Sequence, residues 1–182
     1  MKVPRGDKVR PTQDRVRQAL FSSLATRIPC CRFLDLFAGS GAVGLEAWSR
    51  GAAQVCWVES DARVFAVLQD NLGVLCGKAS GHTGEQEWRS IRSDVFRFLN
   101  GLQGLAVYDI VFADPPYDRI DEVKWAMRLL DELARQQVLA ENGVFVMEQA
   151  REEAAALHPA WDVMAMKEYG GTRLTVYGRR QI

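Results

Sequence analysis

Several features that would assign the 182-residue chain to a particular class of protein are absent from its sequence. No apolar run approaches the length of about 18 residues that a membrane-spanning helix needs, and the start shows no apolar signal-peptide segment. The four cysteines show no CxxC pair and no cysteine–histidine spacing, so they suggest neither a zinc site nor a secreted disulfide framework. We therefore expect a cytoplasmic protein that uses no metal and contacts no membrane.

Internal repeats and low-complexity tracts are also absent, and the composition is that of an ordinary globular domain. Hydrophobic residues make up 48% of the chain and charged residues 25%, which fits one soluble domain. A chain of this length buries roughly 70% of the surface that its unfolded form exposes, so it needs no disulfide to fold. We expect a single domain over residues 1–182, in which residues 1–28 form a basic arm and a helix.

The net charge of zero is unevenly distributed along the chain. Residues 1–32 hold eight lysines and arginines against Asp7 and Asp14, so this segment is basic and the remainder is acidic. A basic arm on an acidic body is compatible with nucleic-acid binding, which a uniform zero charge would argue against. The alternative is a solvated N-terminal tail with no partner.

A change of pattern near residue 32 separates an N-terminal helix from a series of alternating strands and helices. Pro11 and Thr12 predict the start of the first helix, with Thr12 as its N-cap, and apolar residues recur at helical spacing over residues 16–24 until Pro29 ends it. The predicted strands are Phe33–Phe37, Val55–Val58, Trp88–Arg92, Tyr108–Ala113, Val144–Met147, Trp161–Lys167 and Thr172–Tyr177. The predicted helices among them are Ala42–Arg50, Asp61–Leu72 and Asp121–Arg135, and Gly77–Gln86 is predicted to be a loop.

Strands that alternate with helices and are apolar on both faces predict a parallel sheet that helices cover on each side. The end of the chain differs, because Gly170-Gly171 between the last two strands predicts an antiparallel hairpin. A parallel sheet that closes in such a hairpin is not the usual dinucleotide-binding layout.

A glycine-rich loop follows the first predicted strand. Gly39, Gly41 and Gly44 satisfy the GxGxxG pattern between a strand and a helix, and Glu59 follows Gly39 by twenty residues. This is the fingerprint of dinucleotide binding, but the same geometry suits S-adenosylmethionine, because both ligands need a close backbone approach and an acid for ribose hydroxyls. The loop alone therefore leaves nicotinamide and S-adenosylmethionine open.

Acidic residues near the ends of the strands favour a cationic cofactor. Asp35, Glu59, Asp94 and Asp114 are predicted to lie at the carboxyl edge of the sheet, where ligands of such folds bind. This rim suits a sulfonium that carries an ammonium group, whereas it would repel a pyrophosphate. The alternative for Asp94 is that it only caps a helix starting at Val95.

The segment Asp114-Pro115-Pro116-Tyr117 follows the fourth predicted strand. The two prolines hold the chain extended and offer no N–H groups, so the remaining polar groups are acceptors: the Asp114 carboxylate and the Pro115 carbonyl. Such a pair suits the two hydrogens of a planar exocyclic amine, and the Tyr117 ring can stack on the base that carries the amine. The alternative is a rigid strand terminator with no chemical role.

The segments LDLFAGSGAVGLEAWSRGA (residues 34–52) and FADPPY (residues 112–117) resemble class I S-adenosylmethionine-dependent N-methyltransferases. Together with RPTQDRVRQALFSSL (residues 10–24), they make the chain similar to the bacterial RsmD family, from Arg10 to the EYGGTRLTVY segment near the end. The DPPY motif is shared with DNA adenine, RNA and protein glutamine methylases, so it specifies chemistry rather than substrate. The Arg-Pro-Thr segment is the family-specific part.

The resemblance implies an α/β, Rossmann-like class I methyltransferase fold with a mostly parallel seven-stranded sheet, helices on both faces and a C-terminal antiparallel hairpin. It implies the cofactor S-adenosyl-L-methionine and methylation of the N2 amine of a guanine in 16S ribosomal RNA. The partner would be ribosomal RNA within a 30S subunit or its assembly intermediate, and we expect the enzyme to act as a monomer.

The resemblance also implies roles for individual residues, transferred by position. Those implied to bind the cofactor are Asp35, Phe37, Gly39, Ser40, Gly41, Glu59, Ser60, Asp94, Val95 and Asp114. Those implied to act in catalysis are Asp114, Pro115, Pro116 and Tyr117. Those implied to approach RNA or to close over the cofactor are Arg10, Thr12, Arg15 and Arg17.

Three alternatives remain at this stage. The same fold can methylate adenine in DNA or a protein glutamine, although the predicted loop at residues 77–87 is too short for a target-recognition domain. A nicotinamide oxidoreductase would need a Tyr-x-x-x-Lys pair or a well-placed histidine, and neither His82 nor His158 is suitably placed. A non-catalytic RNA-binding scaffold would not require Asp114 to be a carboxylate.

Overall fold

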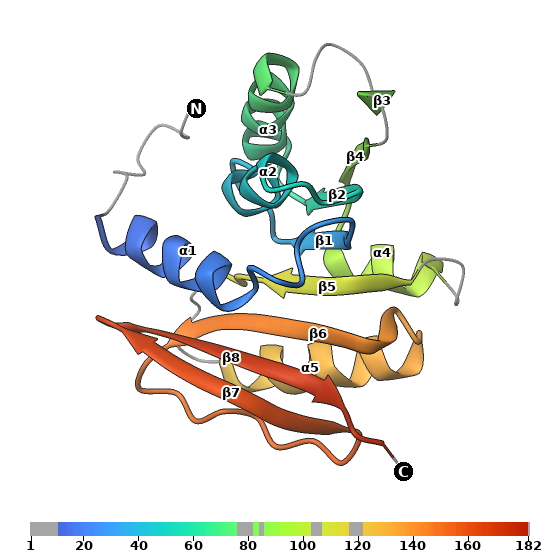
Figure 1. Cartoon of the computed structure of the whole chain (residues 1–182). Helices are drawn as coiled ribbons and strands as arrows, with labels where there is room; N and C mark the ends of the chain where they lie inside the picture. The colour runs from blue at the N-terminus through green and yellow to red at the C-terminus, as the bar shows by residue number, and fades with distance from the viewer. Residues whose placement is uncertain (1–10, 76–81, 84–85, 103–106, 117–121, 182) are drawn as a thin grey trace.

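The computed structural model describes residues 11–75, 82–83, 86–102, 107–116 and 122–181, and it shows one β-sheet flanked by helices (Figure 1). The helices are α1 (Pro11–Ser23), α2 (Ala42–Ser49), α3 (Ala62–Leu75), α4 (Val95–Leu102) and α5 (Glu122–Arg135). The strands are β1 (Arg32–Leu36), β2 (Gln54–Glu59), β3 (His82–Thr83), β4 (Gln86–Arg92), β5 (Tyr108–Ala113), β6 (Leu139–Ala150), β7 (Trp161–Tyr169) and β8 (Thr172–Arg179).

The described strands form one sheet in the order β3-β4-β2-β1-β5-β6-β8-β7. Strands β4, β2, β1, β5 and β6 are parallel to one another, and β8 and β7 complete the sheet as an antiparallel hairpin. Apart from the two-residue β3, this is the predicted seven-stranded sheet, so the predicted fold class is confirmed. The loop predicted at 77–86 is wrong at His82 and Thr83, which pair with Glu87 and Gln86 at the edge of the sheet.

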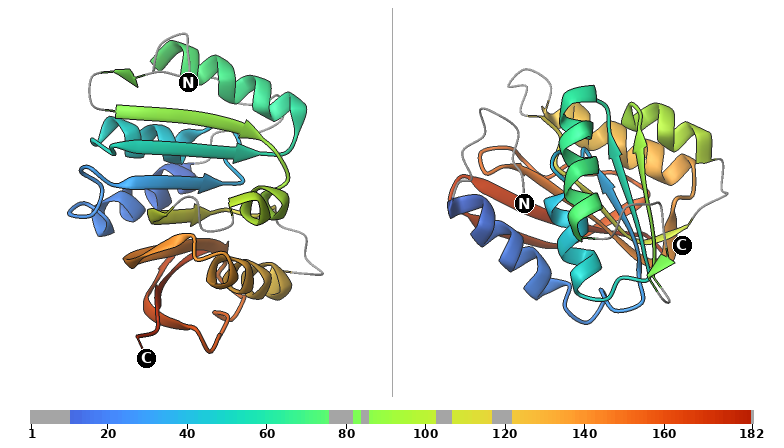
Figure 2. Two further views of the ribbon diagram at one scale, coloured as in Figure 1. Left: turned by 90° about the vertical axis from the view of Figure 1, so that its right-hand side faces the viewer. Right: turned by 90° about the horizontal axis from the view of Figure 1, so that it is seen from above.

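Helices cover both faces of the sheet (Figure 2). Side chains of α1, α2 and α3, among them Phe21, Leu45 and Leu68, pack in one buried cluster on one face, which we call the α1 face. Side chains of α4 and α5, among them Leu99 and Leu130, pack in a second cluster on the opposite face. Because the central strands contribute to both clusters, most of their residues are apolar on both faces.

Helix α1 begins one residue before its predicted N-cap. Because Pro11 is its first residue, Thr12 lies inside the first turn, and its prediction as the N-cap is wrong. Proline is favoured at the first helical position, since its missing N–H would have no partner there. Val16, Leu20 and Leu24 are buried on the α1 face, as their spacing predicts.

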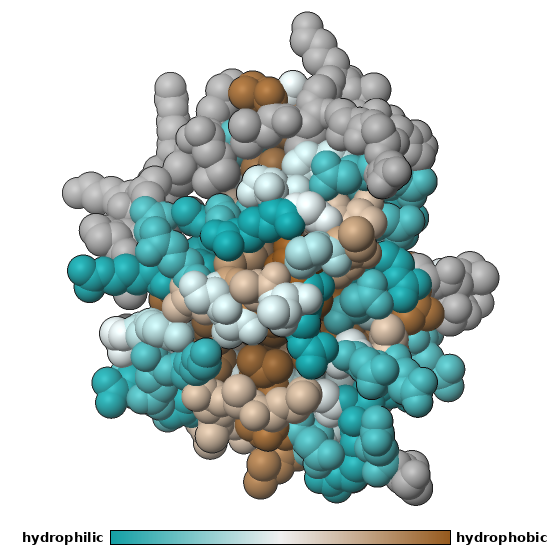
Figure 3. All heavy atoms as spheres, in the orientation of Figure 1, coloured by the Kyte–Doolittle hydropathy of each residue, from teal (hydrophilic) through white to brown (hydrophobic). Residues whose placement is uncertain are grey.

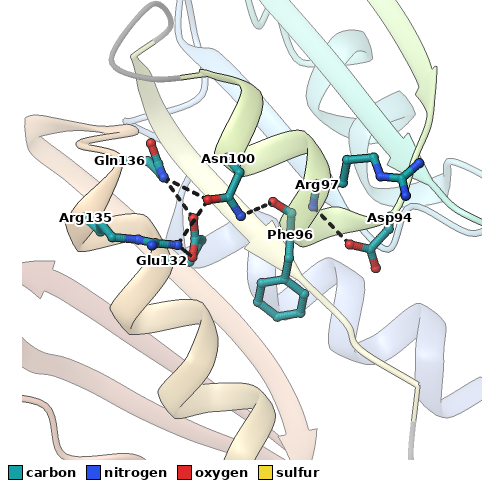
Figure 4. A network of polar contacts seen from close by, with 7 residues as sticks. All are labelled: Asp94, Phe96, Arg97, Asn100, Glu132, Arg135 and Gln136. Carbon is teal, nitrogen blue, oxygen red and sulfur yellow. Dashed lines mark hydrogen bonds and ion pairs between the residues drawn. The ribbon is translucent and has the colours of Figure 1, made fainter.

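Helix α4 was not among the predicted helices, although its residues are strongly amphipathic. Phe96, Phe98 and Leu99 are buried, and Asn100 joins α4 to α5 through hydrogen bonds that its side-chain oxygen accepts from Arg135 (3.1 Å) and Gln136 (3.2 Å). Figure 4 shows this network, with Asp94 at the opposite end of α4. Two turns are too short for a confident periodic signal, which explains why the sequence suggested only a possible cap at Asp94.

The hairpin of β7 and β8 forms the outer edge of the sheet. Met164 and Met166 on β7 are 57% and 56% exposed, and Figure 3 shows apolar side chains gathered over the part of the molecule where this hairpin lies. None of the described helices combines the length and the apolar character that crossing a membrane requires.

Trp57 on β2 supports the glycine-rich loop from below. Its ring is fully buried, and its Nε1–H donates to the Gly41 carbonyl oxygen at 3.2 Å. A Cβ atom at Gly44 would lie 2.2 Å from Trp57 Nε1, so the first turn of α2 fits against the indole only because this residue is glycine. The ring therefore fixes how closely the loop approaches the sheet.

We predict that Gly44→Ala lowers the free energy of unfolding by about 1–3 kcal/mol, the usual cost of overpacking a core. Gly73→Ala is the matched control, because Gly73 is also helical and no described atom would lie within 4 Å of its added Cβ. That variant should be neutral or stabilised by up to about 1 kcal/mol. Urea unfolding of both variants is the measurement, and equal effects would contradict the role given to Trp57.

Candidate cofactor and catalytic site

Asp35 is the most deeply buried acid of the site, and it anchors the start of α2. Its side chain is 1% exposed, and its Oδ2 accepts the Gly44 N–H at 2.8 Å. The N-cap of α2, Gly41, has no side chain to satisfy that donor, so a carboxylate from β1 does so instead. Burial raises the pKa of Asp35 well above its usual range, the nearby charges of Asp114 and Glu59 add to the rise, and the Gly44 N–H opposes it.

The glycine-rich loop has the unusual backbone that its sequence predicts. Gly39 and Gly41 have φ angles of 55° and 86°, in the left-handed region where glycine carries no Cβ penalty. Phe37 also has a positive φ, 58°, which is strained for a bulky residue and marks the sharp exit from β1. On the far side of the loop, the buried Asn71 donates from Nδ2 to the Ser40 carbonyl oxygen at 3.0 Å.

Glu59 at the end of β2 joins the glycine-rich loop to the turn between β2 and α3. Its Oε2 accepts the Gly39 N–H at 2.9 Å, and its Oε1 accepts the Asp61 N–H at 2.8 Å. A carboxylate has about four lone-pair sites, so both oxygens can still accept hydrogen bonds from hydroxyl groups. Glu59 therefore has a structural role, and it can still accept the hydrogen bonds from ribose hydroxyls that the sequence predicts.

Asp94 caps α4, as the alternative interpretation of the sequence proposed. Its Oδ1 accepts the Arg97 N–H at 3.0 Å, and Val95 is the buried first residue of the helix. Ser60, next to Glu59, is exposed. These residues follow neighbouring strands β4 and β2, so the structure brings them to the same edge of the sheet as the glycine-rich loop.

Asp114 directly follows β5, at the centre of the sheet. No residue that the structure describes donates a hydrogen bond to its carboxyl group, and burial raises the pKa of Asp114 to about 7. Pro115 is half-buried and Pro116 is exposed, so the motif leads from the core to the surface. Tyr117 lies outside the described residues.

Glu148 on β6 is an acid of this edge that the sequence analysis missed. Burial, followed by the negative charge of Asp114, raises the pKa of Glu148 to about 8. Its position could have been found, because Glu148 follows the apolar run Val144–Met147 just as Asp114 follows Ile110–Ala113. An acid directly after the apolar run of each of two neighbouring parallel strands is the signal.

The acids of the α1 face form a row along the carboxyl edge of the sheet. In spatial order they are Glu59 on β2, Asp35 on β1, Asp114 after β5 and Glu148 on β6. The strand register places Asp35 beside Trp57 and Phe112, so Asp35 lies one side-chain repeat deeper than the others. We call these four residues the acid row.

The described part of the predicted RNA-binding segment lies in α1. Arg15 is exposed, whereas Arg17 is partly buried and pairs with Asp14 at 2.8 Å. The N-terminal end of α1 and the carboxyl ends of β5 and β6 lie on the same side of the molecule (Figure 1). Arg10 lies outside the described residues, and of Thr12 only its place in the helix is described.

The fold is that of a class I methyltransferase. The chain belongs to the family described as Conserved hypothetical protein 95, whose model matches residues 1–178, and the resemblance to RsmD proteins is confirmed. Ribosomal RNA small subunit methyltransferase D of Escherichia coli strain K12 is 36% identical over 179 residues, which cover 97% of this chain and 83% of the relative.

Two solved structures show the same fold. The E. coli protein yhhF, described as a methyltransferase, has a TM-score of 0.78 at 33% identity, with 100% of this chain and 92% of that chain covered. SMU.776, solved in complex with SAH, has a TM-score of 0.71 at 15% identity, with 93% of this chain and 50% of that chain covered. At this identity the comparison shows only that the two proteins share a fold.

The raised pKa of Asp114 predicts how stability depends on pH. Above pH 4 the unfolded chain releases the Asp114 proton while the folded chain retains it up to about pH 7, so ionisation in this window destabilises the fold. Asp114→Asn has no charge to bury. We expect it to be nearly neutral at pH 4 and more stable than the wild type at pH 8, by about 1–4 kcal/mol, since one pKa unit corresponds to about 1.4 kcal/mol.

Asp61→Asn is the control for this prediction. Asp61 accepts the N–H groups of Val64 and Arg63 at the start of α3, and these bonds lower its pKa. Its contribution to stability is therefore present above about pH 4 and is lost only at lower pH, so Asp61→Asn should destabilise the fold by nearly the same amount at pH 4 and at pH 8. Thermal unfolding at both pH values is the measurement, and a pH-independent effect of Asp114→Asn would contradict the buried ionisation.

Proposed function

We propose that the protein transfers a methyl group from S-adenosyl-L-methionine to the exocyclic N2 amine of a guanine in small-subunit ribosomal RNA. The observation that carries the proposal is the half-buried Asp114 carboxyl at the end of the central strand, which has a raised pKa and no donor among the described residues. It rests as well on the relatives, which are named as ribosomal RNA methyltransferases.

The residues around the glycine-rich loop fit the cofactor. A Cβ at Gly39 would have no described atom within 4 Å, so the loop is open on this side, and Glu59 beside it makes the rim acidic. Such a rim suits the ammonium and sulfonium charges and the ribose hydroxyls of S-adenosylmethionine, and it would repel the pyrophosphate of a nicotinamide dinucleotide. When bound, this cofactor supplies an electrophilic methyl group.

Asp114 can compensate for the weak nucleophilicity of an exocyclic amine. The lone pair of such an amine is delocalised into the base ring, so the nitrogen is a weak nucleophile. A hydrogen bond from the amine to the Asp114 carboxylate orients the nitrogen and stabilises the positive charge that it acquires when it forms a fourth bond. The Pro115 carbonyl is the second acceptor of the motif, and Tyr117 would stack on the base.

The base reaches this site only after it leaves its stack, which costs a few kcal/mol in paired RNA and less in a loop. The N-terminal arm, with Arg10 and Thr12 near its junction with α1, would contact the phosphates nearby, together with Arg15 and Arg17. The substrate would be the small subunit or an assembly intermediate, and the enzyme would act as one domain and as a monomer.

The oxidoreductase alternative gains no support from the histidines. The His158 ring binds Asp131 at 2.9 Å and accepts the Ala160 N–H, in the connection between β6 and β7. It is thus committed to a structural contact away from the glycine-rich loop.

We predict that Asp114→Asn retains the affinity for S-adenosylhomocysteine within about threefold but loses methyl transfer by about 10²–10³, as removal of a charge-stabilising group does. The amide keeps the shape of the side chain but removes its negative charge. Transfer of a tritiated methyl group to naked 16S rRNA, to 30S particles and to DNA, followed by nucleoside analysis, measures both activity and product. Calorimetry measures the cofactor affinity.

Glu141→Gln is the matched control, because Glu141 is an exposed acid at the opposite end of β6. It should methylate at the wild-type rate. Labelled N6-methyladenine, or near wild-type activity of Asp114→Asn, would overturn the proposal, and tight binding of NADH would overturn the cofactor.

The exposed Arg15 gives a separate prediction about RNA binding. Arg15→Gln should raise KM for the RNA substrate several-fold, with kcat and cofactor affinity unchanged, because a phosphate contact adds affinity without taking part in the reaction. Arg27→Gln removes the same charge at an exposed residue that bonds the Asn142 carbonyl oxygen, and it should leave KM unchanged. Titration with salt checks the mechanism, since only Arg15→Gln should reduce the salt dependence of binding.

A further inference from the structure

Glu148 lies beside Asp114 on the neighbouring strand. Phe112 and Ala113 of β5 are in register with Val146 and Met147 of β6, so the next residues along the two strands are Asp114 and Glu148. Phe112 and Val146 belong to the cluster of the α1 face. Because side chains alternate along a strand, Asp114 and Glu148 also point to the α1 face.

Among the residues that the structure describes, none provides Glu148 with a counter-charge or a hydrogen-bond donor. Its partner on β8 is Leu174, which is 3% exposed, and no described residue donates a hydrogen bond to the Glu148 carboxyl. Its pKa, raised to about 8, reflects this poor solvation together with the charge of Asp114. A partly buried acid without a partner costs stability, and such groups are typical of sites that bind a ligand.

The order of the strands indicates which ligand Glu148 faces. Glu59 and Asp35 lie on the cofactor side of Asp114, where the glycine-rich loop connects β1 to α2, and both carboxylates already accept backbone N–H groups. Glu148 lies on the opposite side of Asp114, one strand further from the loop. A methyl donor and a methyl acceptor must meet at Asp114 from opposite sides, so Glu148 belongs with the acceptor.

We propose that Glu148 is a specificity-determining residue that accepts the N1–H of the target guanine while Asp114 accepts a hydrogen of the N2 amine. This inference rests on the proposed function and assigns a residue to the choice of base. Guanine is the RNA base whose amine lies next to a ring N–H donor, so its edge matches two adjacent carboxylates. In adenine and cytosine the ring nitrogen beside the amine has a lone pair, which a carboxylate would repel.

Hydrogen bonds from two guanine donors would also reduce the cost of placing two negative charges side by side at Asp114 and Glu148. Hydrogen bonds to the ionised form of a carboxyl favour that form, so guanine would offset part of the repulsion between Asp114 and Glu148. Above the raised pKa of Glu148, about 8, both carboxyls are ionised, and a base that presents a lone pair to Glu148 leaves their repulsion in place. Below that pH a protonated Glu148 can donate to the lone pair, so the preference for guanine is measured above pH 8. Glu148 would therefore favour guanine in two ways. It accepts a hydrogen bond from the N1–H of guanine, and its ionised form repels the ring lone pair that other bases present.

The test replaces the target guanine by 2-aminopurine, which keeps the amine but has a lone pair at N1. Small subunits are reconstituted around rRNA that carries 2-aminopurine at the guanine which the wild-type enzyme methylates. We expect the wild type to prefer guanine in kcat/KM by about ten- to a hundredfold, the ratio that one charge-assisted hydrogen bond supplies. This first measurement requires no variant to fold.

Glu148→Gln should reduce that preference to about threefold or less, because its amide can either accept from N1–H or donate to a lone pair at N1. It should act mainly through KM for the RNA, and its affinity for S-adenosylhomocysteine should stay within about twofold. Glu141→Gln, on the same strand, should retain the full preference. Thermal unfolding and calorimetry of each variant establish that it is folded.

Two results would overturn the inference: equal use of guanine and 2-aminopurine by the wild type, or an unchanged preference in Glu148→Gln. In both cases the proposed function stands, provided that the wild type forms N2-methylguanine. If the wild type forms no N2-methylguanine in any substrate, the proposed function fails, and the role of Glu148 fails with it.

Discussion

The hydrogen bond from the Gly44 N–H to the buried Asp35 carboxylate is the contact on which the arrangement of the site depends. It joins the start of α2 to the middle of the sheet, and it is possible only because Gly44 leaves room for the Trp57 ring beneath it. The loop between β1 and α2 is thereby held from below by an indole and from the side by Glu59. Its open side then faces the carboxyl edge, where a ligand can approach the backbone.

The acid row imposes a cost that the rest of the fold has to offset. Burial raises the pKa of Asp35, Asp114 and Glu148, which means that the ionised forms are less stable inside the protein than in water. The two large clusters on the faces of the sheet provide the compensating stabilisation. We expect such a cost at a site whose binding and chemistry need negative charges in a poorly solvated place. N–H donors of the bound ligands would then stabilise these charges.

Much of the fold and part of the site could be predicted from the sequence because strong local signals specify them. The apolar run before Asp114 predicts β5 with its observed bounds, and Gly170-Gly171 predicts the hairpin. The helix start was misplaced at Thr12, since capping preference alone does not reveal that Pro11 occupies the first turn. Helix α4 was missed because two turns give little periodicity, and β3 was missed because two residues give none.

The contacts that distinguish the acids from one another are long-range, and no local pattern contains them. Asp35 lies within the apolar strand β1 and Asp114 directly follows the apolar strand β5, yet nothing local shows that the first is bound to a helix N-terminus and that the second has no donor among the described residues. The parallel register of β5 and β6 then makes Glu148 the neighbour of Asp114, although 34 positions separate them in the chain. Adjacent parallel strands bring the residues near their carboxyl ends together. A side chain that completes a site is therefore best sought near the carboxyl end of the strand that is next in space. The sheet topology identifies this strand, whereas the sequence motif does not.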